Sequence, residues 1–190
     1  MFESASWLNR PAQFEVSENK LKIWTDEKTD FWRETHYGFT RDSGHAYGVD
    51  VSGDFTAQVR VNGCFEAQYD QAGILVRADA ENWVKAGVEL SDEVLTISSV
   101  LTVGSSDWAV GASLPTGEFW IRATVKSRAL LLQYSDDGNR WSLIRLAPFP
   151  FNGPLLVGPM CCSPQRARLT VEFDCFEVIQ PPVGLLHDPA

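Results

Sequence analysis

Apolar and polar residues alternate with a period of two along most of this chain. Such alternation predicts β-strands that have one side against a core and the other side in solvent. Helical spacing is not sustained in any segment. The alternation is clearest in residues 54–61, 70–77, 82–90, 118–126 and 167–179.

Turn-forming residues separate these segments and indicate how the strands are connected. Residues 136–139, Asp-Asp-Gly-Asn, stand between the apolar runs 130–135 and 141–144 and predict a β-hairpin. Short strands at a spacing of roughly 8–12 residues are typical of sandwiches and jelly rolls. We therefore predict an all-β fold, a two-sheet antiparallel β-sandwich, as a single domain over residues 1–190. Residues 180–190 are expected to form a surface tail.

Composition narrows the possible partners. The 190 residues are 44% hydrophobic, which suits one globular domain, and the formal net charge is −9. Since no Lys/Arg cluster offsets this charge, nucleic acid and anionic membranes are poor candidates. The first residues lack the pattern of a signal peptide, and no apolar run is long enough to span a bilayer. We expect a cytoplasmic protein.

The four cysteines are Cys64, Cys161, Cys162 and Cys175. Two of them are adjacent, which fits no common disulfide framework, and three lie in strand-like runs. We expect reduced, mostly buried thiols. Without a Cys-x-x-Cys pair or a Cys/His cluster, we expect neither a metal site nor a cofactor.

The polar sides of segments 70–77 and 82–90 suggest a function. If the two segments pair through residues 78–82, Arg77 lies near Trp83 and Lys85. A ligand cleft with basic groups, a carboxylate and aromatic walls is one interpretation. The alternative is a surface network of ion pairs beside a packed Trp, in which each pair contributes only about 0.2–1 kcal/mol.

Two glycines occur on the same polar sides. Gly73 and Gly87 are expected to leave space for a ligand to approach the sheet.

Further aromatic residues occur beside hydrogen-bonding groups in segments 30–38, 66–71 and 105–108. Flat sugar faces stack on Trp and Tyr rings, while sugar hydroxyls need polar partners, so this mixture suits a carbohydrate. In this hypothesis Arg77 and Lys85 hold anionic or hydroxyl groups, and Glu89 accepts hydroxyl protons. The candidate ligand-binding residues are Trp32, His36, Tyr69, Gln71, Arg77, Trp83, Lys85, Glu89 and Trp108.

Several short motifs carry a family resemblance, in residues 30–39, 69–77, 83–89, 106–108 and 134–141. Together they resemble the regulation-of-enolase family, and the resemblance extends from about Phe14 to Ile179. It implies the concanavalin A-like jelly roll of lectins and glucanases. A similar module follows the catalytic domain of some bacterial β-xylosidases. The resemblance thus suggests carbohydrate binding but brings no catalytic residues.

The sequence gives little support for a catalytic function. Glycoside hydrolysis uses paired carboxylates, and the chain lacks the Glu-x-Asp-x-x-Glu run of retaining glucanases. Asp70 with Glu89 is a conceivable pair across strands, and no nucleophile motif accompanies the histidines. We therefore predict non-catalytic, lectin-like binding of a small carbohydrate or a sugar-derived, possibly anionic metabolite. The alternatives are a protein-interaction module that regulates a metabolic enzyme and an unrecognised glycoside-acting enzyme.

Overall fold

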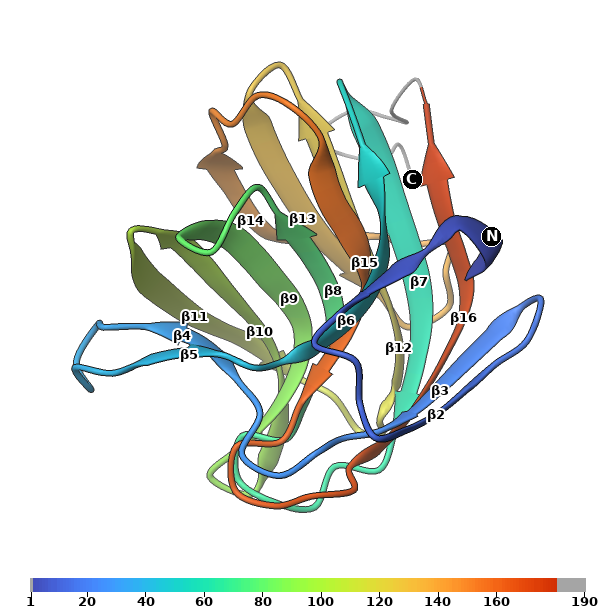
Figure 1. The fold of residues 1–190 in the computed structure, drawn as a ribbon, viewed down its shortest axis with the longest axis vertical. Coiled ribbons are helices and arrows are strands. Elements are labelled where there is room, and N and C mark those ends of the chain that lie inside the picture. The colour runs from blue at the N-terminus through green and yellow to red at the C-terminus, as the bar shows by residue number, and fades with distance from the viewer. Residues whose placement is uncertain (1, 181–190) are drawn as a thin grey trace.

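The computed structural model describes residues 2–180, which form two large antiparallel sheets and one small one (Figure 1). A short 3-10 helix, η1 (Phe2–Ser4), precedes the strands. Sheet A runs in the order β1 (Ser6–Leu8), β6 (His45–Val51), β15 (Leu155–Cys162), β8 (Gln71–Arg77), β9 (Asn82–Ser91), β10 (Val94–Val103) and β11 (Ser105–Ser113). Sheet B runs in the order β14 (Ser142–Pro148), β13 (Ala129–Ser135), β12 (Glu118–Lys126), β7 (Phe55–Gly63), β16 (Thr170–Ile179), β3 (Lys20–Trp24) and β2 (Gln13–Val16). The small sheet is the hairpin of β4 (Phe31–Arg33) and β5 (Thr40–Asp42).

The predicted all-β sandwich is confirmed, and so are its clearest strands. The alternating segments correspond to β7, β8, β9, β12 and β16, and the predicted hairpin is β13–β14. Among the described residues, no helix is long and apolar enough to cross a membrane. The predicted tail lies outside the described residues, apart from Gln180.

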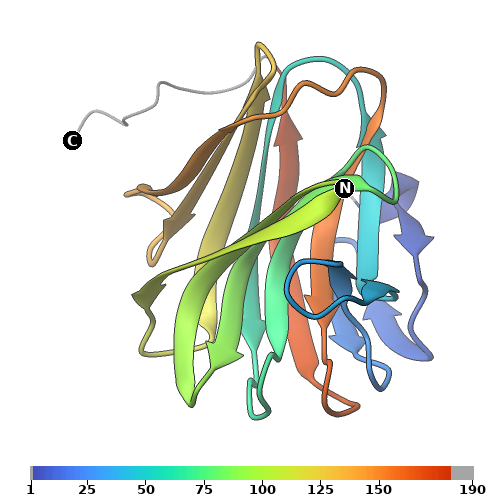
Figure 2. The same cartoon turned by 90° about the vertical axis from the view of Figure 1, so that its left-hand side faces the viewer.

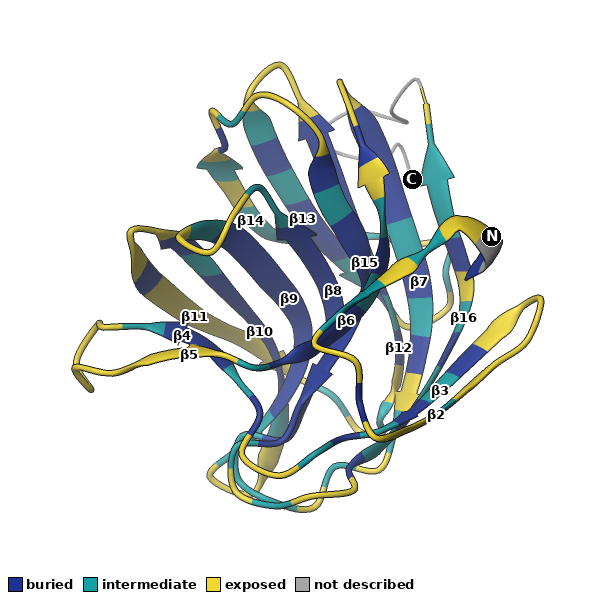
Figure 3. Cartoon of the chain, viewed as in Figure 1, coloured by how far each residue is buried: buried dark blue, intermediate teal, exposed yellow. Residues whose placement is uncertain are grey.

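The main core lies between sheets A and B, and Figure 3 shows the dark, buried strands at the centre of each sheet. Alternate residues of β8, such as Ile74 and Val76, face alternate residues of β7 and β12 in this layer. Burying each such side chain contributes about 1.5–3 kcal/mol. The side chains on one side of each central strand therefore form the core and stabilise the fold.

A β-bulge in β16 interrupts the predicted alternation. The register with β7 shifts between Asp174 and Glu177, and Cys175 has a φ of 51°. The extra residue turns Cys175 into solvent and places Phe176 in the core. The expectation of mostly buried thiols is thus half right, because Cys161 and Cys162 are buried while Cys64 and Cys175 are exposed.

The outer side of sheet A carries a second, smaller core beneath the β4–β5 hairpin. Phe31 of the hairpin packs on Trp83 of β9, with ring centroids 5.8 Å apart, and Leu75 and Met160 complete the contact. The main chain of Arg33 donates a hydrogen bond to Ser106 of β11. Figure 2 shows the hairpin lying against sheet A, and its residues Phe31 and Trp32 share the second core with residues of β8 and β9.

Candidate functional site

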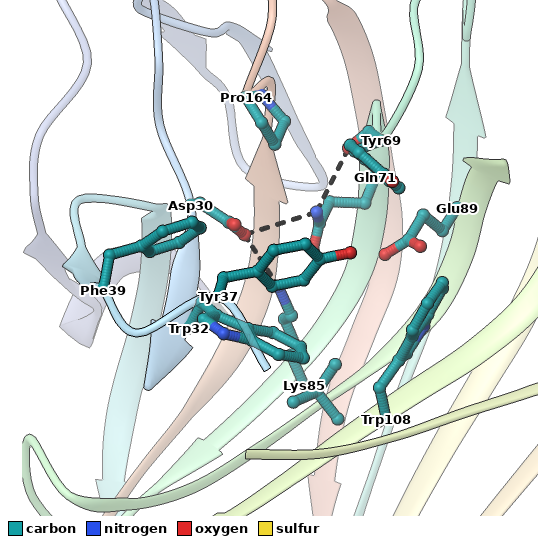
Figure 4. A pocket seen from close by; sticks show the side chains of 11 residues that line it. Asp30, Trp32, Tyr37, Phe39, Tyr69, Gln71, Lys85, Glu89, Trp108 and Pro164 are labelled. Atoms are coloured by element: carbon teal, nitrogen blue, oxygen red, sulfur yellow. Dashed lines mark hydrogen bonds and ion pairs between the residues drawn. The ribbon is translucent and has the colours of Figure 1, made fainter. Parts of the chain in front are cut away.

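A cavity of about 200 Å³, here called the inner cavity, opens between the β4–β5 hairpin and the outer face of sheet A (Figure 4). Strands β8 to β11 supply its floor, and the hairpin and two loops supply its walls. Five of its lining side chains are aromatic. The lining residues are Asp30, Trp32, Tyr37, Phe39, Tyr69, Gln71, Lys85, Glu89, Val100, Trp108 and Pro164.

The hairpin loop positions Tyr37 through an unusual backbone. Glu34 and His36 have φ values of 60° and 64°, and the amides of Thr35 and Tyr37 each donate to the carbonyl two residues earlier. These are γ-turns with positive φ, a rare and strained form. They turn Tyr37 toward the cavity, where its ring stacks on Phe39 with centroids 5.6 Å apart.

A fully buried carboxylate holds the loop that carries Tyr69. Asp70 accepts hydrogen bonds from the amides of Glu66 and Ala67, from the Ser163 hydroxyl at 2.6 Å and from the Arg166 guanidinium at 2.8 Å. Both oxygens of this carboxylate therefore accept hydrogen bonds from groups outside the cavity. Asp70 is a positioning residue for its neighbours, and this arrangement gives no support to Asp70 and Glu89 as the conceivable catalytic pair.

Lys85 lies at the floor of the inner cavity, only 3% exposed. Its ammonium group contacts the Asp30 carboxylate at 2.8 Å, and the Gln71 amide is 3.4 Å from the same oxygen. Burial is the largest single effect and lowers the pKa of Lys85, but the charge and hydrogen bond of Asp30 together with the charges of Cys162 and Glu89 outweigh it, and the net shift is upward. The positive charge of Lys85 is thus already balanced by the Asp30 carboxylate.

Glu89 projects into the cavity with 6% of its surface exposed. Among the described residues, none donates a hydrogen bond to its side-chain carboxylate. Burial raises the pKa of Glu89 to about 7, despite the opposing effect of Lys85. The pKa of Tyr37 is also raised, first by a side-chain hydrogen bond with Tyr69 and in part by the charge of Glu89. Glu89 is therefore a strong acceptor without a protein partner.

Six of the nine residues predicted from the sequence line the inner cavity: Trp32, Tyr69, Gln71, Lys85, Glu89 and Trp108. His36 lies next to it, in a hollow of about 630 Å³ that we call the outer hollow. This hollow is lined by Trp32, Thr35, His36, Tyr37, Ser106, Asp107 and Trp108.

The structure does not bring Arg77 and Trp83 to the cavity. They are cross-strand partners, as the predicted pairing of the two segments requires. The Arg77 guanidinium, however, binds both carboxylate oxygens of Asp42, at 2.6 and 2.8 Å. Trp83 is 1% exposed and belongs to the second core.

Gly73 and Gly87 serve strand packing instead of leaving space for a ligand. They are cross-strand partners, and a Cβ atom at either position would overlap the main chain of the facing strand. The glycines let β8 and β9 approach closely at this point. This contact keeps the neighbouring pair Gln71 and Glu89 in register.

Sequence reasoning missed five lining residues: Asp30, Tyr37, Phe39, Val100 and Pro164. Asp30 and Tyr37 fall in the aromatic and charged segment 30–38, so the signal was present without a way to choose among its members. Val100 and Pro164 carry no chemical signal of their own. Among residues 2–180, no group of three or more His, Cys, Asp or Glu side chains is placed to hold a metal ion.

The two seven-stranded antiparallel sheets define the class of fold. This is the jelly-roll sandwich of lectins and glucanases. A legume lectin-like domain from Entamoeba histolytica matches with a TM-score of 0.61 at 11% identity, over 95% of this chain and 91% of that one.

The chain belongs to the family described as "Protein of unknown function (DUF1349)", whose model matches residues 7–181. It is 50% identical to "Regulation of enolase protein 1" of Saccharomyces cerevisiae over 184 residues, which are 96% of this chain and 93% of that protein. A crystal structure of a functionally unknown protein from the same yeast matches with a TM-score of 0.93 and 49% identity, covering 96% of this chain and 99% of that one.

Glycoside hydrolase structures share the fold as well. The GH43 protein BlXynB of Bacillus licheniformis matches with a TM-score of 0.72 at 17% identity. The match covers 93% of this chain but only 36% of that protein. At this identity the likeness concerns the fold alone.

Proposed function

We propose that this protein is a lectin-like binder that holds one small, hydroxyl-rich ligand, such as a sugar unit, in the inner cavity. The observation that carries the proposal is the Glu89 carboxylate, which is buried, faces the cavity and has no protein donor among the described residues. A carboxylate that faces a cavity without a protein donor can accept hydrogen bonds from ligand hydroxyls there, and hydrogen bonds to a charged acceptor are the stronger ones.

The aromatic walls support the same class of ligand. The indole N–H of Trp32 donates to the Thr35 carbonyl at 3.2 Å, and that of Trp108 donates to the Ser98 hydroxyl at 3.0 Å. Both rings therefore offer apolar surface instead of a donor. Such surface suits the C–H faces of a sugar ring.

Charge favours a neutral ligand over an anionic one. Asp30 compensates Lys85 and Asp42 compensates Arg77, so neither cation is available to hold a phosphate or a carboxylate. Glu89 adds negative charge to the cavity when it is ionised. The proposal therefore does not retain the anionic ligand that the sequence suggested.

Non-catalytic binding fits this set of side chains better than hydrolysis. Glycosidases need two carboxyl groups that act on the same bond. In the inner cavity the Asp30 carboxylate is paired with Lys85, which leaves Glu89 as the unpaired carboxyl group of the described lining.

Calorimetric titration of the purified protein with neutral monosaccharides, beginning with xylose and glucose, tests the proposal. We expect a saturable heat with at least one of them and a parallel rise in melting temperature. Glu89→Gln should weaken binding by about tenfold, because the amide oxygen of Gln is a neutral and weaker acceptor than the carboxylate and its NH2 group adds a donor. Glu93→Gln, the same change in an exposed turn, is the matched control. Equal binding by both variants, or no binding at millimolar concentrations, would refute the proposed site.

A second candidate function is regulation of a metabolic enzyme by direct contact. It is favoured by the 50% identity to a yeast protein named for regulation of enolase. Size-exclusion chromatography of this protein mixed with purified enolase tests it. A stoichiometric complex that persists in the Glu89→Gln variant and in the presence of sugars would support this function, and separate elution at micromolar concentrations would count against it.

A further inference from the structure

The outer hollow adjoins the inner cavity. The two share three aromatic lining residues, Trp32, Tyr37 and Trp108. The inner cavity, of about 200 Å³, is below the range of roughly 300–1,000 Å³ that is usual for drug-sized ligands and suits one ring-sized unit. The outer hollow is larger, at about 630 Å³.

The shared rings retain exposed surface that a single enclosed unit would leave in water. Tyr37 is 50% exposed and Trp108 is 37% exposed, although both reach into the inner cavity. Aromatic surface exposed beside a binding cavity commonly marks a contact for further ligand.

The polar groups of the outer hollow differ from those of the inner cavity. Inside, Glu89 and Lys85 are buried, and Lys85 is already paired with the half-buried Asp30 carboxylate. Outside, Asp107 is 70% exposed and makes long contacts of 3.3 Å to Arg145 of β14. This is the arrangement expected where one unit is fully enclosed and the next remains hydrated.

We propose that the ligand is the end of an oligosaccharide, with its terminal unit in the inner cavity and the next unit in the outer hollow against Tyr37 and Trp108. This inference rests on the proposed function and adds that the site recognises a chain end. Stacking of the second unit on these rings should strengthen binding by about tenfold, which corresponds to about 1.4 kcal/mol.

Matched series of xylose, xylobiose and xylotriose, and of glucose, cellobiose and cellotriose, test the inference by calorimetric titration. We expect the affinity to rise about tenfold from the first to the second member of the bound series and to change little at the third. Asp107→Asn and His36→Asn should reduce the gain for the second unit while monosaccharide binding is unchanged. Asn suits position 36 because it tolerates a positive φ.

Asp136→Asn, in an exposed turn of sheet B, is the control and should bind every sugar as the unchanged protein does. If disaccharides bind no more tightly than the monosaccharide, the inference is overturned and the proposed function stands. If no member of either series binds at millimolar concentrations, both are overturned. If the Asp107 and His36 variants lose monosaccharide binding as well, the division into two subsites is wrong.

Discussion

At the scale of single residues, the Glu89 carboxyl group links pH to stability. Its pKa is about 7 in the folded protein, against an ordinary value of 4.5. Between these pH values the folded state binds more protons than the unfolded state. The free energy of unfolding therefore falls as pH rises from 4.5 to 7, by about 3 kcal/mol in total, and is then constant with respect to this group.

Glu89→Gln should remove this dependence. At pH 8 the variant is expected to be more stable than the unchanged protein by up to about 3 kcal/mol, while near pH 4 the two should differ little. Urea unfolding at several pH values measures the difference, with Glu93→Gln as the exposed control. Parallel stability curves for the Glu89→Gln variant and the unchanged protein would show that Glu89 titrates normally.

Breaking the buried Asp30–Lys85 ion pair should lower the stability more than breaking an exposed ion pair. Asp30→Asn leaves a buried ammonium group without its counter-charge, which should lower the free energy of unfolding by about 3–5 kcal/mol. Asp107→Asn removes the partner of Arg145 from an exposed pair and should cost less than about 1 kcal/mol. Urea unfolding compares the two, and equal small losses would mean that the Lys85 pair is effectively solvated.

At the scale of elements, the close contact of β8 and β9 depends on glycine. Gly73→Ala would push a Cβ atom against the Ala86 carbonyl of β9 and should cost about 1–3 kcal/mol. Gly111→Ala in β11 is the matched control, because its Cβ would lie 3.6 Å from the nearest atom, an ordinary contact. Thermal unfolding of both variants tests this, and an unaffected Gly73→Ala would show that the two strands can separate freely.

The β4–β5 loop should gain stability when its strain is removed. Glu34 is exposed and has a φ of 60°, a conformation that costs about 1–3 kcal/mol for most residues but little for glycine. Glu34→Gly should therefore be about 1 kcal/mol more stable than Glu34→Ala, which keeps the strain. Their melting temperatures give the comparison. The reverse order would mean that the loop changes conformation readily.

Strands, and the side on which each residue lies, could be predicted from the sequence because alternation is a local property. Lys85 and Glu89 were found in this way. Arg77 lies on the same face as Gln71 but six residues further along β8, about 20 Å away, so sharing a face did not mean sharing a site.

Loop placement could not be predicted because it depends on contacts between distant segments. The amide of Arg33 bonds Ser106, and this contact helps to bring Tyr37 and Phe39 over β10 and β11. Alternation contains no information about such a contact. The bulge at Cys175 could not be predicted for a related reason. One additional residue in a strand does not change the composition of the segment in a recognisable way.

At the scale of the whole molecule, one core joins both sheets and should make unfolding a single transition. Trp83 reports on sheet A and on the second core, because it lies on β9 and packs against the hairpin. Tryptophan fluorescence and far-ultraviolet circular dichroism should therefore give coincident urea transitions. A fluorescence change that precedes loss of circular dichroism would show that side-chain packing around some of the seven tryptophans is lost before the strands unfold.

The alternation along β8 and β9 also has a consequence for divergence. Ala72, Val84 and Val88 hold the sandwich together, while their neighbours Gln71, Lys85 and Glu89 face the opposite side. Natural selection can therefore exchange the outward residues without altering the interior, provided that Lys85 changes together with its partner Asp30. Descendants of one ancestral sandwich can acquire new specificities while their fold stays constant, and the same separation makes this face a scaffold for engineered receptors.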